Sequence, residues 1–260
     1  MNIRSLSDAL SARFPEKDRA SFDFDGLQVC PDEGREVRRI VTALDVTRES
    51  VAAAIDSGAD LLLTHHPILF SPVRTLDPAS SMDADLATTL LKNSVALITL
   101  HTRFDAGLGG INDTLAEKLG LTCVTPFGTA DEPTPLGRIG NLKMPLSPEE
   151  FAQEVGRVLG THVLLTSGES PVLRTVVVGG AAGDYLEATL ESDADAIVTG
   201  ELSHHRRLLA AYRKKTVIEA GHFGSEIVFC EAAERVLLEI DPTLDVCAFS
   251  KTPHEVAILP

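Results

Sequence analysis

The chain has 260 residues, and 23 Lys and Arg against 38 Asp and Glu give it a formal net charge of −15. Hydrophobic residues make up 44% and charged residues 23% of the sequence, which excludes a disordered protein, a collagen-like repeat and a small disulfide scaffold. The acidic balance disfavours nucleic acid as a partner, because a protein that tracks a phosphate backbone needs clustered Lys and Arg.

The N-terminal segment predicts an amphipathic helix rather than a secretory signal. Ile3, Leu6, Ala9, Leu10 and Phe14 recur near one helical face, and charged residues interrupt the segment early. No apolar run approaches the ~20 residues that span a bilayer, so we expect a cytoplasmic protein without membrane contact. The four cysteines are far apart and form no C-x-x-C pair, and they are interpreted as small hydrophobic residues rather than a zinc finger.

Short β-branched runs then alternate with helical patterns, which predicts an α/β protein with parallel or mixed sheets. Runs such as DLLLT and TVVVGG are continuously apolar, as in strands that are covered on both faces. The glycine-rich segment VVGGAAGD favours a tight turn over a nucleotide-binding loop, since it lacks the full G-x-G-x-x-G spacing. The predicted strands are Arg39–Leu44, Asp60–Thr64, Val95–Leu100, Arg174–Val178, Ala196–Thr199 and Thr216–Ala220, and the predicted helices are Arg48–Ser57, Ala84–Asn93, Asp113–Leu119, Pro148–Leu159, Asp184–Ser192, His204–Tyr212 and Glu226–Glu239.

The alternation is interrupted between Phe127 and Ser147. This stretch is rich in Pro and Gly, which predicts either a linker between two halves or a longer loop with an edge strand. Each half contains an apolar strand that leads to a His-His pair, and this parallel indicates a pseudo-repeated architecture.

Six of the eight histidines fall in four short segments, each at or just after a predicted strand. The segments are LLLTHHP with His65 and His66, LITLHTRFD with His101, TGELSHH with His204 and His205, and EAGHFGSE with His222. Ligand sites in open α/β sheets form at the carboxyl ends of strands, so these side chains are expected along one rim. His162 and His254 lack an acidic context and are interpreted as ordinary surface or core residues.

Carboxylates accompany two of these segments. Asp105 follows His101 by four residues, and Glu226 follows His222 at the helical i,i+4 spacing. A helix that begins near Gly221 would place both members of the second pair on one face. Imidazole nitrogen together with carboxylate oxygen is a ligand set for zinc, iron, manganese or cobalt.

The adjacent pair His65 and His66 favours two metal ions over one. Successive side chains of an extended backbone diverge, so the two rings are better suited to different ions. A carboxylate can bridge two cations held ~3.5–4 Å apart, which is a common hydrolytic arrangement. Glu201, His204 and His205 fit either a role at such a site or a solvent-facing helix start.

Taken together and in this order, the motifs THHP, HTxxDxxxGGxND, GExxHH and GHxxSE resemble the Nif-three-like dinuclear metal family. Its members are often labelled type 2 homologues of GTP cyclohydrolase I. The resemblance extends from DGLQV near the N-terminus to the closing KTPHEVAIL. Two positions depart from the family pattern: Asp25 stands where the opening motif commonly reads NGLQV, and Glu201 replaces the Asp of GDxxHH.

The resemblance implies a fold of two related α/β lobes with mixed sheets. Residues 1–127 and 222–260 are expected to form the first, discontinuous lobe, and residues 128–221 the second. The family also implies a toroidal homohexamer with its sites facing an internal cavity, and two divalent transition-metal ions per chain. The implied metal ligands are His65, His66, Asp105, His222 and Glu226, with Asp105 and Glu226 as bridges and His101 beside the site as a ligand or as a neighbour of the ligands.

These patterns favour a metal-dependent hydrolase that acts on a nucleotide or another phosphate-containing small molecule. Two divalent cations lower the pKa of water enough for attack on a purine carbon or a phosphoryl group near neutral pH. His101, Glu201, His204 and His205 are the candidate catalytic residues, as proton-transfer groups. The alternative is a non-catalytic metal-binding protein with a regulatory or scaffold role.

Overall fold

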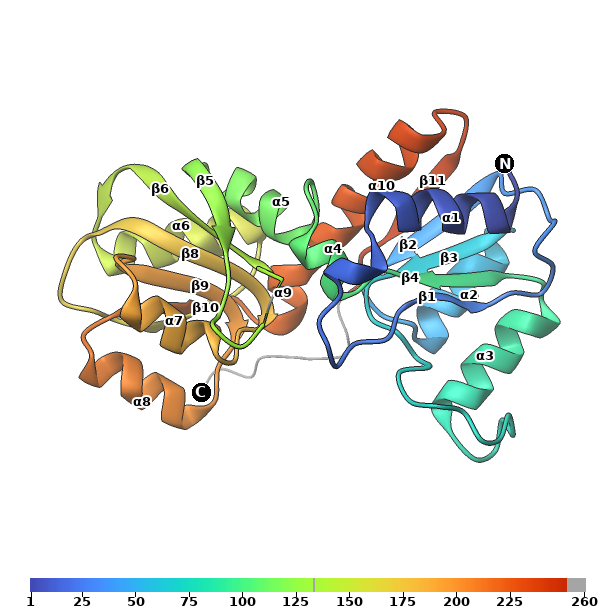
Figure 1. The fold of residues 1–260 in the computed structure, drawn as a ribbon, viewed down its shortest axis with the longest axis horizontal. Helices are drawn as coiled ribbons and strands as arrows, with labels where there is room; N and C mark the ends of the chain where they lie inside the picture. The colour runs from blue at the N-terminus through green and yellow to red at the C-terminus, as the bar shows by residue number, and fades with distance from the viewer. Residues whose placement is uncertain (133, 252–260) are drawn as a thin grey trace.

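The computed structural model describes residues 1–132 and 134–251. Two α/β lobes lie side by side, each built on a mixed sheet, with α4, α5, α9 and α10 between them (Figure 1). The expected architecture of two lobes with mixed sheets is confirmed. None of the described helices combines the length and the apolar character that a bilayer-crossing segment requires.

The first sheet has the strand order β1-β4-β3-β2-β11. Strands β2, β3, β4 and β11 run parallel, and β1 is antiparallel to β4. Buried side chains of α1 and α10 pack on one face of this sheet, and those of α2 and α3 pack on the other. The elements are α1 (Ile3–Arg13), the 3-10 turn η1 (Glu16–Asp18), β1 (Gly26–Val29), β2 (Arg39–Ala43), α2 (Arg48–Asp56), β3 (Leu61–Thr64), α3 (Met82–Lys92), β4 (Ala96–Thr99), α4 (Thr102–Ala106), α5 (Ile111–Lys118), α10 (Val228–Ile240) and β11 (Asp245–Phe249).

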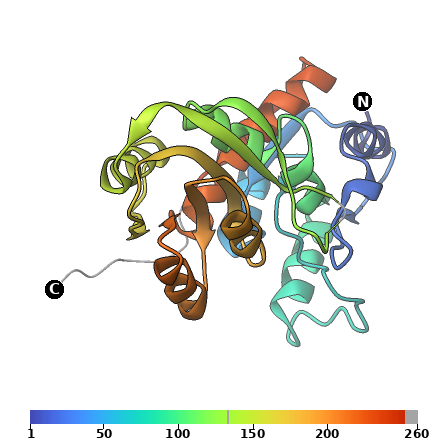
Figure 2. The ribbon, with the colours of Figure 1, turned by 60° about the vertical axis from the view of Figure 1, so that its left-hand side comes forward.

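The second sheet has the strand order β5-β6-β8-β9-β10-β7, with β8, β9 and β10 parallel and the other strands antiparallel to their neighbours. Helix α6 packs on one face and α7 and α8 on the other, as the turned view of this lobe shows (Figure 2). Its elements are β5 (Thr122–Phe127), β6 (Gly137–Leu146), α6 (Pro148–Leu159), β7 (Leu164–Thr166), β8 (Val172–Ala181), α7 (Tyr185–Glu191), β9 (Ala196–Glu201), α8 (His204–Tyr212) and β10 (Thr216–Glu219). Helix α9 (His222–Glu226) follows β10 and packs against β8 and β9, whereas residues from 222 onward were expected with the first lobe.

The stretch between Phe127 and Ser147 contains a loop and then a strand, as one of the two predictions states, but the strand is internal to the sheet and not at its edge. It contains β6, which pairs with β5 on one side and β8 on the other. The glycines that suggested a loop are needed for close packing, since a Cβ on Gly140 would lie 3.1 Å from the Cβ of Leu121. Strand β5 pairs with β6, so residues 122–127 belong to the second sheet and not to the first lobe as expected.

The predicted strands and helices correspond to observed elements. Helix α1 illustrates how the local sequence determines such an element. Asn2 caps α1 by accepting a hydrogen bond from the Ser5 amide at 2.8 Å. Ile3, Leu6, Leu10 and Phe14 are at most 1% exposed, as the helical spacing predicts. Strands β1, β5, β6, β7 and β11 were not predicted.

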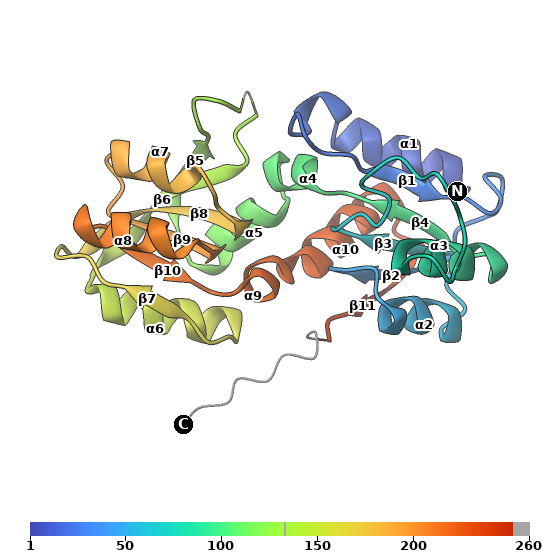
Figure 3. The same cartoon turned by 90° about the horizontal axis from the view of Figure 1, so that it is seen from below.

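The carboxyl ends of the parallel strands of both sheets point to the junction between the lobes. The ends of β2, β3 and β4 approach from one side, and those of β8, β9 and β10 from the other. Helices α9 and α10 pass between the lobes, as the view from below shows (Figure 3). One buried cluster contains side chains of both sheets, so the lobes share a continuous core.

Candidate metal centre

Four histidine rings meet where the two sheets face each other. His65 and His66 follow β3, His101 follows β4, and His222 begins α9 directly after β10. The ring centroids of His65 and His66 lie 4.8 Å apart, those of His65 and His101 5.0 Å, and those of His66 and His222 5.3 Å. These four histidines therefore lie together at strand ends, as expected, but the strands belong to two facing sheets.

Two buried carboxylates lie inside the same cluster. Glu226 Oε2 is 3.1 Å from His66 Nε2 and 3.0 Å from His222 Nε2. Asp105 Oδ1 is 3.8 Å from His65 Nε2. His222 and Glu226 stand one turn apart on α9, so the predicted short helix with both residues on one face is confirmed.

Each histidine is held through its Nδ1 atom, which leaves Nε2 directed at the cluster. The acceptors are the Leu100 carbonyl for His65 at 2.8 Å, Asp45 for His66 at 2.7 Å, Asp23 for His101 at 2.8 Å and Glu201 for His222 at 3.0 Å. When the neutral ring donates from Nδ1, the lone pair of Nε2 is free to bind a cation. Carboxylates that fix histidines in this way are typical of metal sites.

Three potential metal-ligand atoms at the centre are left without a hydrogen bond. His65 Nε2, Asp105 Oδ1 and Glu226 Oε2 are buried, and none has a hydrogen-bond partner. Buried polar atoms are nearly always satisfied, so three unsatisfied ones in one cluster indicate a site for a cation or water. Imidazole and carboxylate donors suit divalent transition metals, and the residues present therefore fit such ions.

Two groups of donors could each hold an ion. The first contains His65, His66 and His101, and the second contains His66, His222 and Glu226; within each group the potential ligand atoms lie within 4.8 Å of one another. His66 belongs to both groups. The two groups of potential ligands therefore overlap at His66.

Protonation of the metal-free cluster compensates for its buried negative charge. Burial lowers the pKa of His66, but its hydrogen bond to Asp45 and the nearby Glu226 raise it more, to about 10. Glu226 raises the pKa of His222 to about 9. Burial lowers the pKa of His65 to about 4, and burial raises the pKa of Asp105 well above its usual range. Protons on His66 and His222 thus occupy the Nε2 positions that a metal would take.

Metal is expected to stabilise the protein more strongly as the pH rises from about 6 to about 9. The pKa values of His66 and His222 lie above that of an unfolded histidine, so their protons stabilise the metal-free fold below pH ~6.5, and this stabilisation is lost as the pH rises toward the folded values. A metal ion must displace these protons. The difference in Tm with and without chelator, measured across this range, checks the prediction, and a difference that shrinks with pH contradicts it.

Gly180 makes room for the Glu226 carboxylate. It lies in β8 with φ +63°, and a Cβ at this position would overlap Glu226 Oε1 and approach His222 Nε2 to 3.2 Å. Its amide donates a hydrogen bond to Ser225 Oγ at 3.0 Å, which ties β8 to α9. The glycine pair of the VVGGAAGD segment is therefore explained by close packing against the centre.

Gly180→Ala is expected to lower metal content several-fold, because the added methyl displaces Glu226. Gly183→Ala is the matched control, since Gly183 also has a positive φ, +46°, but nothing lies within 4 Å of its added Cβ. Both variants carry the backbone strain of roughly 1–2 kcal/mol, and only the first touches the centre. Elemental analysis of both proteins checks this, and equal metal loss in the two would show that strain alone is responsible.

A buried ion pair supports the segment that carries His101 and Asp105. Arg103, between them on α4, is 1% exposed and donates from Nε to Asp25 Oδ2 at 2.8 Å. The same Asp25 oxygen accepts from the His101 amide at 2.9 Å. Asp23, two residues before Asp25, accepts the hydrogen bond from His101 Nδ1. Burial raises the pKa of Asp23, but His101 and Thr102 lower it more, to about 2. Asp23 is therefore a permanent anion at this position.

The model of the family described as Duf34/NIF3 (NGG1p interacting factor 3) matches residues 1–254. The chain belongs to this family. The expected resemblance is confirmed.

Named relatives and solved structures agree with the Duf34/NIF3 assignment. A GTP cyclohydrolase 1 type 2 homolog of Clostridium perfringens is 28% identical, with 98% of this chain and 99% of that protein covered. One of Streptomyces coelicolor is 33% identical, with 89% and 84% covered. The crystal structure of the Staphylococcus aureus hypothetical protein SA1388 has a TM-score of 0.89 at 25% identity, covering 100% of this chain and 99% of that one. The fold of this chain is therefore Nif-three-like.

Not every predicted site residue reaches the centre of this Duf34/NIF3 protein. Within residues 1–132 and 134–251, Glu201 contacts it through His222. His204 and His205 begin α8 with exposed side chains, and neither belongs to a potential metal group within residues 1–132 and 134–251. His162 is exposed, as its plain context predicted, and His254 lies outside the described residues.

Sequence reasoning missed the two aspartates that hold His66 and His101. Asp45 follows β2 as His65 follows β3, so the same strand-end rule applies to it. It was overlooked because no histidine stands beside it in the sequence. Asp23 precedes β1 in a segment without a recognisable metal-site pattern, and only the tertiary fold brings it to His101.

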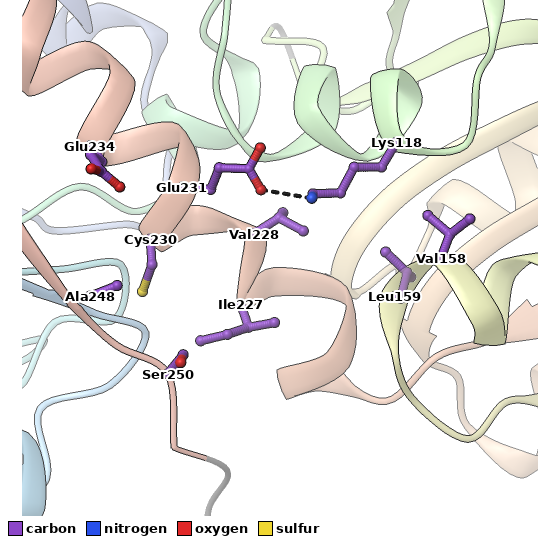
Figure 4. A pocket seen from close by; sticks show the side chains of 10 residues that line it. All are labelled: Lys118, Val158, Leu159, Ile227, Val228, Cys230, Glu231, Glu234, Ala248 and Ser250. Carbon is purple, nitrogen blue, oxygen red and sulfur yellow. Dashed lines mark ion pairs between the residues drawn. The ribbon is translucent and has the colours of Figure 1, made fainter.

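A separate pocket lies between α5, α6, α10 and the segment after β11, and none of the cluster residues lines it (Figure 4). Its one ion pair joins Lys118 and Glu231 at 2.7 Å. Burial raises the pKa of the Cys230 thiol to about 11, so this cysteine is protonated and a weak nucleophile at neutral pH. The groups of potential metal ligands among the described residues lie at the histidine cluster and not in this pocket.

Proposed function

We propose that the protein binds two divalent transition-metal ions per chain and acts as a metal-dependent hydrolase on a nucleotide or another phosphate-containing small molecule. The observation that supports this most directly is the pair of overlapping donor groups with three unsatisfied buried atoms. In this proposal His65, His66, Asp105, His222 and Glu226 would hold the ions, and Asp105 and Glu226 would be shared between them. His101 shares a donor group with His65 and His66, which favours a ligand role for it.

Divalent ions bound there supply a Lewis acid that polarises a carbonyl or phosphoryl group and lowers the pKa of water. The protein residues position these donors before any substrate arrives. Asp45, Asp23 and Glu201 fix the rings of His66, His101 and His222 through Nδ1. Because each ring is already oriented, little reorganisation is needed when an ion or substrate binds.

Proton transfer is assigned to groups at the exposed side of the centre. Glu201 is a carboxylate whose side chain is 58% exposed and which holds His222 Nδ1. It is therefore open to solvent while it remains linked to the centre, which supports the proposed proton-transfer role. His204 and His205, three and four residues further along the chain, are exposed and remain proposed proton carriers for a bound substrate.

The deciding experiment is metal analysis of untagged protein followed by turnover assays on nucleotide and phosphoester panels. The proposal predicts close to two ions per chain, with sharply lower content in His65→Ala, His66→Ala and His222→Ala, and turnover that requires the metal. Wild-type metal content in all three variants would exclude the ligand set. Two bound ions with no turnover on any panel would instead support the non-catalytic metal-binding role.

We further propose that the chains assemble into a homohexamer. The family resemblance supports this, and so do large apolar side chains left exposed, such as Phe22 at 66% and Leu108 at 74%. Light scattering should give a mass near six times 27.8 kDa. A monomer at micromolar concentration would contradict it.

A further inference from the structure

The side chain of Asn112 lies between the segments that support Asp105 and Glu226, the two inner carboxylates of the centre. Asn112 stands on α5 and is 1% exposed. Its Oδ1 accepts a hydrogen bond from the Gly179 amide at 2.8 Å, and its Nδ2 donates to the carbonyls of Leu136 at 3.0 Å and Asp105 at 3.5 Å. One buried amide group therefore connects α4, β8 and the residue before β6.

Gly179 lies where β8 packs against Glu226. A Cβ on Gly179 would be 3.1 Å from Glu226 Cγ, and a Cβ on the neighbouring Gly180 would overlap Glu226 Oε1. The hydrogen bond from the Gly179 amide to Asn112 thus holds the backbone against which Glu226 rests. On its other side Asn112 reaches the carbonyl of Asp105 itself. The supports of both inner carboxylates are therefore joined through one side chain.

Arg138 holds the segment of Asp105 from the second sheet. Helix α4 has only five residues, so its last carbonyls need partners outside the helix. Arg138 is 4% exposed and donates from Nη2 to the Ala106 carbonyl at 2.7 Å and to the Gly107 carbonyl at 3.3 Å. Its Nε pairs with Asp113 on α5. The end of α4 that carries Asp105 is therefore fixed to β6.

These contacts concern the part of the motif HTxxDxxxGGxND that the proposed metal site leaves unused. The site takes only the His and the first Asp of this motif, and Asn112 and Asp113 are its last two residues. Asn112 acts on the Asp105 carbonyl directly, and Asp113 acts on the next two carbonyls through Arg138. Both ends of the motif thus serve the same carboxylate.

We propose, building on the function above, that Asn112 and Arg138 are positioning residues that fix the separation of the Asp105 and Glu226 carboxylates. Carboxylates shared by two ions hold them at a short, defined distance, so their own separation must be defined as well. A single ion makes no such demand, because each of the two donor groups has three potential ligands of its own. Loss of the positioning contacts is therefore expected to weaken the second ion much more than the first.

The test compares Asn112→Leu, which keeps the approximate size and removes all three hydrogen bonds, with Thr175→Val. Thr175 is buried in β8, and its Oγ1 donates to the carbonyl of Ala196 at 3.3 Å, at the end of β9 remote from the centre. The affinities for the first and second Co²⁺ are measured by competition with a chelator. In Asn112→Leu we expect the second affinity to fall about 10–100-fold, the loss typical of residues that orient ligands, and the first to change by less than about threefold. Thr175→Val should bind both ions like the unsubstituted protein.

The outcomes separate positioning from general destabilisation. Asn112→Ser is measured in parallel, because leucine leaves three buried polar groups unpaired and serine is too short to reach them all. Equal weakening of both ions would show a merely structural role, and unchanged binding of both would show no role; either result overturns the inference. Binding of fewer than two ions by the unsubstituted protein contradicts the proposed function instead.

Arg138→Met provides an independent test, because charge and positioning predict opposite results. Removal of a cation near the centre would by charge alone strengthen the binding of metal ions, whereas loss of positioning should weaken the second ion about tenfold. Arg157→Met removes the same charge from an exposed pair with Glu154 on α6 and is the control. The magnetic coupling between two Mn²⁺ ions falls as their separation grows, so electron paramagnetic resonance should show weaker coupling in Arg138→Met and Asn112→Leu. Tighter binding of the second ion by Arg138→Met, or coupling equal to that of the unsubstituted protein, overturns the inference.

Discussion

Glu226→Gln is expected to lower metal affinity by more than about 100-fold, beyond the 10–100-fold loss typical of residues that only support ligands. Glu226 approaches three histidines, with 3.0 Å to His222, 3.1 Å to His66 and 3.8 Å to His65. Glutamine keeps the size but removes the charge that offsets two neighbouring cations. Metal stoichiometry and Tm, with and without chelator, measure the effect.

The controls for this prediction compare three kinds of carboxylate: one expected to bridge the ions, one that orients a ligand, and one distant from the centre. Asp105→Asn should behave like Glu226→Gln, because both carboxylates face the inside of the cluster. Glu201→Gln should cost less, since Glu201 reaches only His222 Nδ1. Glu231→Gln, on α10 and paired with Lys118, should leave metal content unchanged. If Asp105→Asn keeps both ions while Glu201→Gln loses one, the assignment is wrong. Glu201, and not Asp105, would then be the carboxylate that holds the metal.

Asp25→Asn is expected to lower the free energy of unfolding by about 3–5 kcal/mol, because it leaves the guanidinium of Arg103 buried without its carboxylate. Both side chains are at most 1% exposed, and the pair fixes the His101 amide as well. For a chain of this size the loss corresponds to a Tm decrease of about 10 °C. Thermal and denaturant unfolding of chelated protein measure it without interference from metal.

The comparison variant is Glu36→Gln, which breaks the exposed pair with Arg38. Surface pairs contribute about 0–1 kcal/mol, so its stability should stay near that of the parent protein. A double variant, Asp25→Asn with Arg103→Met, should recover part of the lost stability, because no buried charge then remains unpaired. Equal losses from Asp25→Asn and Glu36→Gln would contradict the role of burial.

The strand-end histidines and the helix that carries His222 and Glu226 could be predicted because they depend on local pattern. An apolar run predicts the strand, and the residue that follows it must emerge at the rim of the sheet. The aspartates that orient the rings could not be predicted in the same way. Asp23 and His101 are 78 positions apart in the sequence, and their hydrogen bond depends on the antiparallel pairing of β1 with β4.

The wrong expectation of an edge strand or a linker at residues 127–147 has a physical origin as well. Gly and Pro are typical of loops, but Gly137 and Gly140 lie within β6 because neighbouring backbone and side chains leave no space for a Cβ. The sequence pattern also does not predict that residues 122–127 join the second sheet, because a short strand with exposed side chains has no continuous apolar run. Both errors concern contacts with partners distant in sequence.

The donors of the centre follow strands of both sheets, with His66 on the loop after β3 and His222 and Glu226 on the helix after β10. An ion bound to them, as proposed above, would link two separately hydrogen-bonded sheets. Chelation then removes a tether, and hydrogen exchange should accelerate in α9 and in the segment after β3 before it does in the interiors of either sheet. The concentration of available metal would thus determine how tightly the two sheets are held together. The rate at which a protease cleaves the junction between them should therefore fall as metal binds.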